Sequence, residues 1–379
     1  MHNPSKKFNP VKIDAVEIHH ISMPLVSRFE TSMHVEHDRE CLLIHLEGDG
    51  QEGWGECVAH LVPWYSYETI GTEWHVLEEF LLPAILGAEL EGAEEFPGRV
   101  NGIKGHPMAK AGLELALWDL EGRLENKPLV ELLGGERARV EVGVSIGIQE
   151  DVGTLLSVIR DHLAEGYRRI KLKIKPGTDL EIVRAVREAH PDLRLQVDAN
   201  AAYEVSQSHI FEQLDPLALQ LIEQPFPAEE LQAHAALQAR LSTPVCLDES
   251  IGSATRARLA LDLGACRVIN IKPGRVGGLS EAVQIHGLCL ERDIPVWCGG
   301  MLETGIGRAS NLALASLPGF TLPGDISATD RYYEVDVASP RFELNSDGTI
   351  DVPNGAGLGV EVDRAALERF TIRTARFSA

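Results

Sequence analysis

The sequence predicts an α/β fold that combines a closed barrel of parallel strands with a smaller neighbouring domain. From about Val140 onward, short β-branched runs alternate with amphipathic helical stretches. Their spacing of roughly 25 residues is typical of parallel strands joined by crossover helices, and eight such strands form a barrel. A doubly wound open sheet is the structural alternative, but no GxGxxG motif follows a first strand.

The barrel strands are expected within eight segments of the chain. They are residues 140–146, 168–174, 193–199, 218–224, 243–249, 267–273, 294–300 and 319–325. Helical patterns lie between them, for example over 180–190 and 279–293.

The first third of the chain has a different pattern. Residues 11–25 and 41–57 alternate like antiparallel strands, and 108–125 has helical spacing. We expect loops over 27–38, which is polar and breaks the alternation, and over 60–69. The tail returns to strands and turns and is expected to pack on the first domain. The predicted domains are therefore 1–135, the barrel over 136–334, and a C-terminal segment over 335–379.

Composition and charge exclude several classes of partner. The chain has 379 residues, 44% of them hydrophobic, and a formal net charge of −22. That charge argues against nucleic acid and against anionic membrane surfaces. No apolar run approaches membrane-spanning length, and the polar first ten residues are not a signal peptide. Six cysteines without a CxxC motif predict reduced thiols in a cytoplasmic protein.

Three acids recur at the ends of consecutive predicted strands. Glu223 follows Asp198 by 25 residues, Asp248 follows Glu223 by 25, and Lys272 comes 24 residues later. All four should therefore lie at the C-terminal face of the barrel, where active sites are built. Each acid taken alone is explained equally well as a helix N-cap. Three converging carboxylates without His or Cys predict a hard cation, Mg²⁺ first, with Mn²⁺ or Co²⁺ as substitutes.

Two lysines alternate on the strand that precedes these acids. In IKLKIKPG, Lys171 and Lys173 point the same way, whereas Lys175 lies beside Pro176, where the strand should end. Lysines at this spacing also occur on solvated edge strands. A lysine base must be neutral, and a pKa shift from about 10.4 to about 7 requires roughly 4–5 kcal/mol. We expect Lys171 near Lys173, Arg275 near Lys272, and the cation itself to supply this bias.

These motifs carry a resemblance to a known family. The KLK of 171–173, the series Asp198, Glu223 and Asp248, and NIKPGRVGG around Lys272 resemble the muconate-lactonising subgroup of the enolase superfamily. Within it, GWGEC, DAN, EQP, LDES, WCGGMLETGIGR and LPGDISA resemble the o-succinylbenzoate synthase / N-acylamino acid racemase family from about residue 11 to the end. The resemblance implies a modified TIM barrel, (β/α)7β, covered by an α+β capping domain.

The resemblance also implies a site and a chemistry. It implies Mg²⁺ on Asp198, Glu223 and Asp248, and Lys173 and Lys272 as acid/base lysines on opposite faces of the substrate. The implied substrate is a small carboxylate, either an N-acylamino acid that is racemised or the precursor dehydrated to o-succinylbenzoate in menaquinone biosynthesis. Homo-oligomers are typical of the family. The remaining candidates for substrate binding or support are Lys171, Asn200, Ser145, Glu249, Arg275, Gly299, Gly300, Met301, Glu303, Asp325, Phe29 and Tyr65.

Several alternatives stay open at this point. Dipeptide epimerases carry Asp-x-Asp where this chain has only Asp325, and a muconate cycloisomerase is a further relative of the same superfamily. Outside the superfamily, a barrel hydrolase with paired carboxylates or a non-catalytic anion-binding barrel would fit the acids alone. The GVSIG at 143–147 matches a hydrolase motif but lacks its triad order. His34, His37 and His60 are interpreted as surface loop residues.

Overall fold

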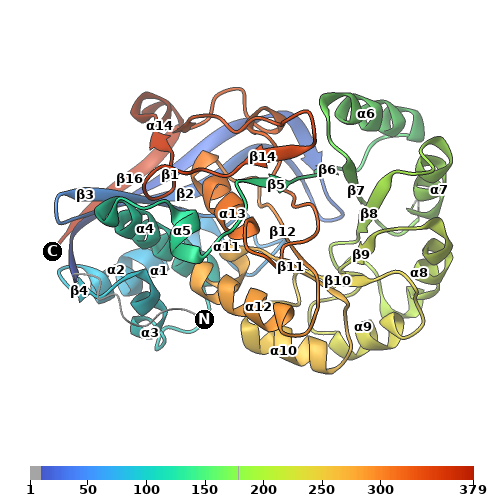
Figure 1. The fold of residues 1–379 in the computed structure, drawn as a ribbon, viewed down its shortest axis with the longest axis horizontal. Coiled ribbons are helices and arrows are strands. Elements are labelled where there is room, and N and C mark those ends of the chain that lie inside the picture. The colour runs from blue at the N-terminus through green and yellow to red at the C-terminus, as the bar shows by residue number, and fades with distance from the viewer. Residues whose placement is uncertain (1–9, 178) are drawn as a thin grey trace.

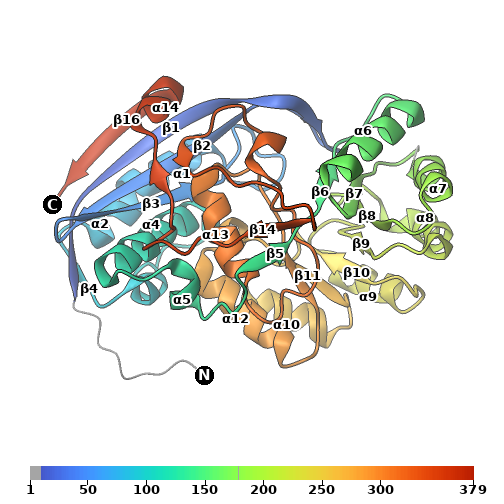
Figure 2. The same ribbon diagram turned by 45° about the horizontal axis from the view of Figure 1, so that its top comes forward.

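The computed structural model describes residues 10–177 and 179–379, which are arranged as a barrel beside a sheet-and-helix cap (Figures 1 and 2). A seven-stranded parallel sheet runs in the order β12-β11-β10-β9-β8-β7-β6. These strands match seven of the eight predicted segments. Their bounds are β6 (Val144–Ile146), β7 (Arg169–Lys173), β8 (Arg194–Asp198), β9 (Leu221–Glu223), β10 (Val245–Leu247), β11 (Val268–Ile271) and β12 (Val296–Cys298).

The eighth predicted strand exists only as two isolated bridges. Phe320 pairs with Val296 on β12, and Gly324 pairs with Val142 just before β6, both in parallel. Residues 320–324 therefore connect the two edges of the sheet and close the barrel. Pro323 lacks a backbone N–H and Gly324 weakens a strand, which accounts for bridges in place of a full strand.

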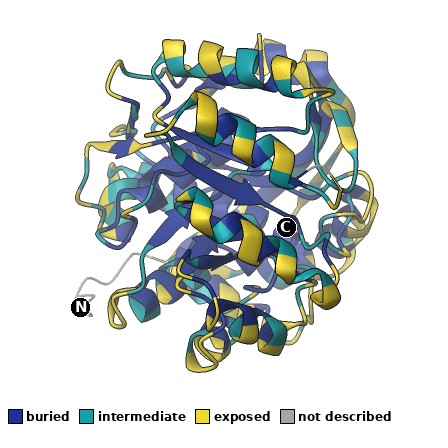
Figure 3. Cartoon of the chain, turned by 90° about the vertical axis from the view of Figure 1, so that its right-hand side faces the viewer, coloured by how far each residue is buried: buried dark blue, intermediate teal, exposed yellow. Residues whose placement is uncertain are grey.

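Helices cover the outside of the barrel. Viewed from the barrel side, their outward faces are exposed and the strands beneath are buried (Figure 3). Several helices begin at a side-chain cap, such as Asp151 before α6 and Ser253 before α10. The barrel helices are α6 (Val152–Glu165), α7 (Asp179–Ala189), α8 (His209–Leu214), α9 (Leu231–Gln238), α10 (Ala254–Asp262), α11 (Pro273–Val276), α12 (Leu279–Leu290) and α13 (Gly305–Ala315).

The cap is an antiparallel sheet backed by a long helix. The sheet follows the order β16-β1-β2-β3, with β4 pairing β1. Helix α4 lies directly on β3: a Cβ at Gly112 would come 2.8 Å from the backbone nitrogen of Cys57, so only glycine permits this approach. The cap elements are β1 (Val11–Glu30), β2 (Val35–Gly48), β3 (Gln51–Cys57), α1 (Ile70–Val76), α2 (Leu82–Ile85), β4 (Glu89–Leu90), α3 (Phe96–Arg99), α4 (Pro107–Glu125) and α5 (Leu129–Leu133).

The prediction of a loop over 27–38 is wrong in its bounds, because the loop is shorter in the structure. Strands β1 and β2 continue as one long hairpin whose turn occupies only 31–34, with a register shift between Pro24 and Phe29. Its polar side chains misled the prediction because this end of the hairpin leaves the cap core and borders the cavity described below. The predicted loop over 60–69 lies between β3 and α1, as expected.

The tail returns to the cap. Strand β16 pairs antiparallel with β1, and β14 pairs with β5, which takes the first residues of the predicted strand at 140–146. The last strand of the tail therefore pairs with a strand of the cap, while the division of the chain into domains stays a prediction. The bounds are β5 (Arg139–Glu141), β13 (Ala338–Ser339), β14 (Thr349–Asp351), β15 (Glu361–Val362), α14 (Arg364–Phe370) and β16 (Thr371–Ser378).

Candidate active site

A cavity lies where the C-terminal ends of the barrel strands meet the cap. Its volume is about 70 Å³, so the side chains around it leave little free space. The barrel contributes three lysines and Asp325 among its side chains, and the cap contributes aromatic and apolar side chains together with two histidines and Glu36. The lining residues are Phe29, Thr31, Met33, His34, Glu36, His60, Tyr65, Ser145, Lys171, Lys173, Asn200, Lys272, Gly300, Met301, Leu302, Asp325 and Tyr332.

The two lysines of β7 both point into this cavity, as their alternation predicted. Lys173 Nζ lies 2.7 Å from Asp198 Oδ2 and 2.7 Å from Asn200 Oδ1. Lys171 is 2% exposed, and its Nζ contacts three carboxylates, at 3.1 Å for Asp198, 2.8 Å for Glu223 and 2.6 Å for Asp325. The competing register is excluded because the Lys175 side chain is 44% exposed and pairs with Glu30.

The three acids lie on neighbouring strands. Asp198 and Glu223 are direct partners across β8 and β9, and Asp248 directly follows the end of β10. All three are buried, at 1%, 0% and 0% exposure. Lys272, which directly follows β11, approaches from the far side, with Nζ 2.7 Å from Asp248 Oδ2. Parallel strands thus gather these carboxylates and amines at one edge, as their sequence spacing predicted.

The acids raise the pKa values of Lys171 and Lys272, contrary to expectation. Burial lowers the pKa of Lys272, but the Asp248 carboxylate outweighs it and leaves the pKa above its ordinary value. Burial likewise opposes ionisation of Lys171, and Asp325, Glu223 and Asp198 raise its pKa well above the usual range. The predicted lowering of lysine pKa by neighbouring cations is therefore not what this arrangement of side chains produces. The prediction considered only the neighbouring cations. Carboxylates lie closer to Lys171 and Lys272 than the other amines do.

Arg275 lies against the acid that holds Lys272. Its Nη1 bonds the Asp248 carboxylate, and its other nitrogens donate to the carbonyls of Ile251 and Asn270. Arg275 therefore acts on Lys272 through a shared carboxylate, a linkage that proximity in sequence did not reveal.

The carboxylates of Asp198, Glu223 and Asp248 suit a hard cation, although their oxygens contact the ammonium groups of the lysines. Burial and the charge of Asp198 raise the pKa of Glu223 to about 8, so these adjacent carboxylates repel one another and a dication would relieve that repulsion. Among the described residues, two groups bring ligand atoms within 4.8 Å of one another, and both lie in the cap: His34–Glu36–His60 and Glu68–Glu73–His106. The barrel acids are not such a group, because the lysine amines lie between their oxygens.

The other predicted residues fall into two sets. Phe29, Tyr65, Ser145, Gly300 and Met301 line the cavity directly. Tyr65 donates its hydroxyl to Asp248 Oδ1 at 2.8 Å, so the cap loop over 60–69 reaches the acids of the barrel.

The second set forms polar contacts at the wall, with Asn200 and Asp325 lining the cavity and Glu249 and Glu303 outside its lining. Asn200 Nδ2 donates to Glu249 Oε1 at 3.1 Å, and burial with the charge of Asp248 raises the pKa of Glu249 to about 7. Glu303 accepts from the Met301 backbone at 2.8 Å. Asp325, with its pKa held at about 2 by Arg169 and Lys171 against burial, joins β7 to the closing segment.

Sequence reasoning missed several residues of the site. Asn270 Nδ2 donates to Glu223 Oε1 at 2.7 Å, and Arg169 Nη1 pairs with Asp325 at 2.5 Å. Both were readable from strand alternation, since Arg169 lies two residues before Lys171 and Asn270 two residues before Lys272. His34 and His60 were interpreted as surface loop residues, which is wrong: both are partly buried and line the cavity.

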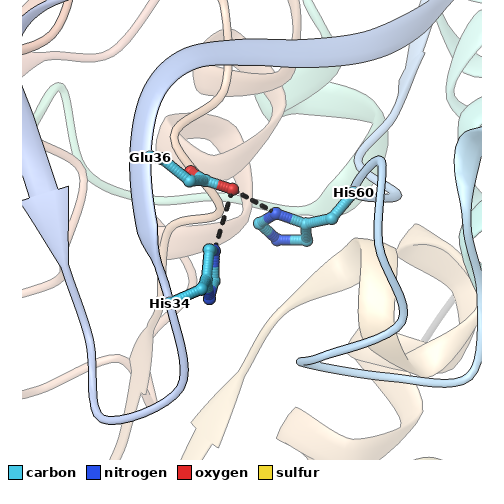
Figure 4. A group of neighbouring side chains, drawn as sticks. All are labelled: His34, Glu36 and His60. Atoms are coloured by element: carbon cyan, nitrogen blue, oxygen red, sulfur yellow. Dashed lines mark hydrogen bonds and ion pairs between the residues drawn. The ribbon is translucent and has the colours of Figure 1, made fainter.

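The two histidines share a carboxylate of the cap hairpin. Glu36 Oε1 lies 3.1 Å from His34 Nε2 and 2.5 Å from His60 Nδ1 (Figure 4). Burial and the neighbouring Arg39 lower the pKa of His60 to about 4, so its imidazole is neutral at pH 7. His37, in contrast, is exposed as predicted.

A strand-end site of acids and lysines, set in a barrel and covered by an α+β domain, defines an enolase-like protein. The family model of the mandelate racemase / muconate lactonizing enzyme N-terminal domain matches residues 14–134, and the enolase C-terminal domain-like model matches 155–366. The chain therefore belongs to the mandelate racemase / muconate lactonizing enzyme family of the enolase superfamily. This finding confirms the resemblance carried by the motifs.

Individual relatives cover nearly the whole chain. An o-succinylbenzoate synthase of Geobacillus kaustophilus is 51% identical over 362 residues, which are 95% of this chain and 96% of that protein. An N-succinylamino acid racemase of Thermus thermophilus is 48% identical, covering 96% of this chain and 98% of that protein. The crystal structure of an enolase-superfamily member from Listeria innocua has a TM-score of 0.93 at 39% identity, covering 97% of this chain and 99% of that one.

Proposed function

We propose that this protein removes a proton from the carbon α to a substrate carboxylate, as an N-succinylamino acid racemase, an o-succinylbenzoate synthase, or both. The observation that supports this most is the placement of Lys173 and Lys272 in one cavity. They stand at the ends of β7 and β11, with β8, β9 and β10 between them in the sheet. Two amines that face one cavity from different sides match a reaction that exchanges a proton on either face of a carbon.

Each amine is positioned by a carboxylate and one further polar group. Asp198 and Asn200 hold Lys173, while Asp248 and the Tyr65 hydroxyl, 3.3 Å away, hold Lys272. In racemisation one lysine takes the α-proton as the neutral amine and the other returns a proton from the opposite face. Because the Asp248 carboxylate favours the ammonium form of Lys272, this lysine becomes a base only when that charge is neutralised.

We propose that Asp198, Glu223 and Asp248 bind Mg²⁺, for which Mn²⁺ or Co²⁺ can substitute. Three buried carboxylates on adjacent strands, free of His and Cys, are the donor type that this ion prefers. When bound, the ion supplies a Lewis acid that stabilises the enediolate formed after proton loss.

The remaining wall of the cavity is proposed to select the substrate. Phe29, Met301 and Tyr65 offer apolar and aromatic contacts, and Ser145 offers a hydroxyl whose oxygen is buried with no partner among the described residues. Such an unpaired hydroxyl is suited to a polar group of the acyl chain. Asn200, Glu249 and the backbone at Gly299 and Gly300 are proposed to hold the lysines and the ligand acids in place.

Dehydration is the second candidate because relatives bear both names. It starts from the same enediolate, with Lys173 as the base and Lys272 remaining a cation that faces the developing charge. The raised pKa of Lys272 beside Asp248 supports this role. Dipeptide epimerisation has less support, since the last barrel segment carries Asp325 alone and Arg169 and Lys171 neutralise it.

The decisive test is deuterium exchange at the α-carbon. The purified protein is incubated in ²H₂O with N-succinyl amino acids of each configuration, with and without Mg²⁺, and α-proton loss is followed by NMR. Exchange of both enantiomers that requires Mg²⁺ is expected. An anion-binding barrel would bind the same ligands without exchange, and a hydrolase would cleave the acyl bond instead.

We also propose an assembly and a location for the protein. A homo-oligomer is proposed from the family, to be checked by light scattering. The six cysteines are buried and unpaired, which supports a reducing compartment such as the cytoplasm. No helix of the described residues is long and apolar enough to cross a bilayer. We keep 1–135, 136–334 and 335–379 as the proposed division into cap, barrel and returning segment.

A further inference from the structure

Three side chains of the cap come together at the cavity wall and are not used by the proposed reaction. His34 lies at the end of the β1–β2 turn, Glu36 on β2, and His60 shortly after β3. Figure 4 shows both imidazoles directed toward one carboxylate oxygen. Their ligand atoms all lie within 4.8 Å of one another, and all three side chains line the cavity.

We propose that His34, Glu36 and His60 form a binding site for a divalent transition-metal ion, with Zn²⁺ as the probe. Two imidazole nitrogens and one carboxylate oxygen are a ligand set found for zinc, with a further position left for water or ligand. The barrel acids offer oxygen alone, so the two sites differ in the ions that they prefer. This proposal stands apart from the proposed function, because neither the two lysines nor the barrel acids contribute to it.

The distances are close to those of a tetrahedral ion. Bonds of about 2.0–2.1 Å place neighbouring ligand atoms about 3.3 Å apart. Glu36 Oε1 is 3.1 Å from His34 Nε2, and widening its 2.5 Å separation from His60 Nδ1 requires a shift of less than about 1 Å. The ring centroids of the two histidines are 5.7 Å apart and nearly perpendicular, so both nitrogens can face one point.

Metal binding fixes the tautomer of each ring. His34 Nε2 and His60 Nδ1, which face the carboxylate, must be bare to bind an ion, so the hydrogen of each neutral ring is then carried by His34 Nδ1 and by His60 Nε2. Of these, His34 Nδ1 lies 3.4 Å from the Thr31 hydroxyl. The Thr31 hydroxyl also accepts from the backbone nitrogens of Met33 and His34, which fixes the turn that presents this ring.

One cation opposes the site. Arg39 Nη1 lies 3.3 Å from His60 Nδ1, and Arg39 is 1% exposed. Its guanidinium donates to the carbonyls of Val58 at 2.6 Å and Ala59 at 3.4 Å, which hold it in place. Its charge weakens binding of a dication, so we expect affinity for Zn²⁺ in the micromolar range and not the tight binding of a structural zinc site.

The experiment is a titration of the full-length protein in excess Mg²⁺, which keeps the barrel acids from competing. We expect one equivalent of Zn²⁺ by calorimetry, and Co²⁺ should show the ligand-field absorption of a nitrogen-containing site. His34→Gln should weaken Zn²⁺ at least about tenfold and abolish the Co²⁺ signal. His37→Gln is the matched control, since it removes an exposed histidine of the same hairpin and should leave both unchanged.

Two further variants keep the result decisive. Asp248→Asn should lose Mg²⁺-dependent activity yet retain the Zn²⁺ site, which separates this proposal from the proposed function. Glu36→Gln replaces His34→Gln if the latter does not fold, as judged by its melting curve. The proposal is overturned if excess Mg²⁺ displaces all Zn²⁺, or if His34→Gln binds Zn²⁺ as tightly as His37→Gln. The cluster is then a hydrogen-bonded link between two cap segments only.

Discussion

Gly299 lies directly against the side chain of Lys272. A Cβ at position 299 would come within 2.7 Å of Lys272 Cε, and within 2.6 Å of Asn270 Nδ2, which bonds Glu223. Both neighbours are buried, so neither side chain has free space to move into. The missing side chain at the end of β12 therefore sets the position of one proposed catalytic amine and of one proposed ligand acid.

Gly299→Ala should consequently impair proton exchange without unfolding the protein. We expect at least about a tenfold loss in kcat/KM, because small displacements of reacting groups are costly. The assay is α-proton exchange in ²H₂O, with folding checked by circular dichroism. Gly287→Ala is the matched control, since a Cβ there meets nothing within 4 Å and should leave activity intact. Equal activity in the two variants would show that Lys272 tolerates displacement.

Asp248→Asn should lose most Mg²⁺-dependent activity. The carboxylate is fully buried and faces both Lys272 and Arg275, so its loss removes one proposed ligand and leaves two cations without their shared anion. Breaking such a buried pair costs about 3–5 kcal/mol in stability. Activity against Mg²⁺ concentration and urea unfolding check the two effects. Full activity at ordinary Mg²⁺ would remove Asp248 from the ligand set.

The parts of the site that the sequence predicted are those set by strand geometry. Asp198, Glu223, Asp248 and Lys272 recur once per strand–helix unit, and parallel strands bring such positions to one face. Lys171 and Lys173 follow from alternation alone. These rules need only the local chain and the order of strands, so one sequence was sufficient.

The parts of the site that the sequence did not predict depend on contacts between distant segments of the chain. The pKa of Lys171 is set by Asp325, which lies 154 positions later and reaches it only through barrel closure. His34 and His60 meet because the cap hairpin extends past the cap core toward the barrel. A polar, non-alternating stretch looks the same whether it faces solvent or a cavity, so the sequence alone could not separate these cases.

Arg275→Gln should raise the pH at which racemisation sets in. Arg275 now shares Asp248 with Lys272, so its removal leaves that carboxylate to act on Lys272 alone and raises the amine pKa further. Lys272 then loses its proton only at higher pH, so the rising, acid-side limb of kcat/KM moves to higher pH. Arg275→Lys, which keeps the charge, should shift the profile less. An unchanged profile would assign Arg275 a purely structural role.

Glu56 should make stability pH-dependent between about pH 4.5 and pH 7. This buried cap residue accepts from Thr304 and Gly307 at the start of α13, and burial with the charge of Glu303 raises its pKa to about 7. A raised acid pKa favours the folded state below about pH 4.5, and this contribution is lost as pH rises through 7. The loss is roughly 3 kcal/mol.

Urea unfolding at pH 5 and pH 7.5 tests this prediction. The wild-type protein should lose more stability between the two pH values than Glu56→Gln, which cannot ionise. Glu52→Gln is a suitable control, since Glu52 lies on the same strand and the neighbouring Arg364 and His45 lower its pKa in spite of burial. The same loss in Glu56→Gln as in the wild type would show that Glu56 does not titrate in this range.

The two lysines should be separable by the enantiomer that each one exchanges. If Lys173 and Lys272 serve opposite faces of the α-carbon, Lys272→Ala abolishes racemisation but still exchanges the α-proton of one enantiomer through Lys173. Lys173→Ala should leave exchange only in the opposite enantiomer. NMR of each N-succinyl amino acid in ²H₂O measures both.

Dehydration makes different demands on the same residues. Lys173 removes the α-proton there, so Lys173→Ala should abolish both reactions. Lys272 needs only to remain a cation, and Lys272→Arg keeps that charge beside Asp248 but supplies no neutral amine near pH 7. It should therefore reduce racemisation much more than dehydration. If Lys272→Ala still interconverts the enantiomers at near the wild-type rate, the arrangement with one base on each face is wrong. Lys173 alone must then reach both faces of the α-carbon.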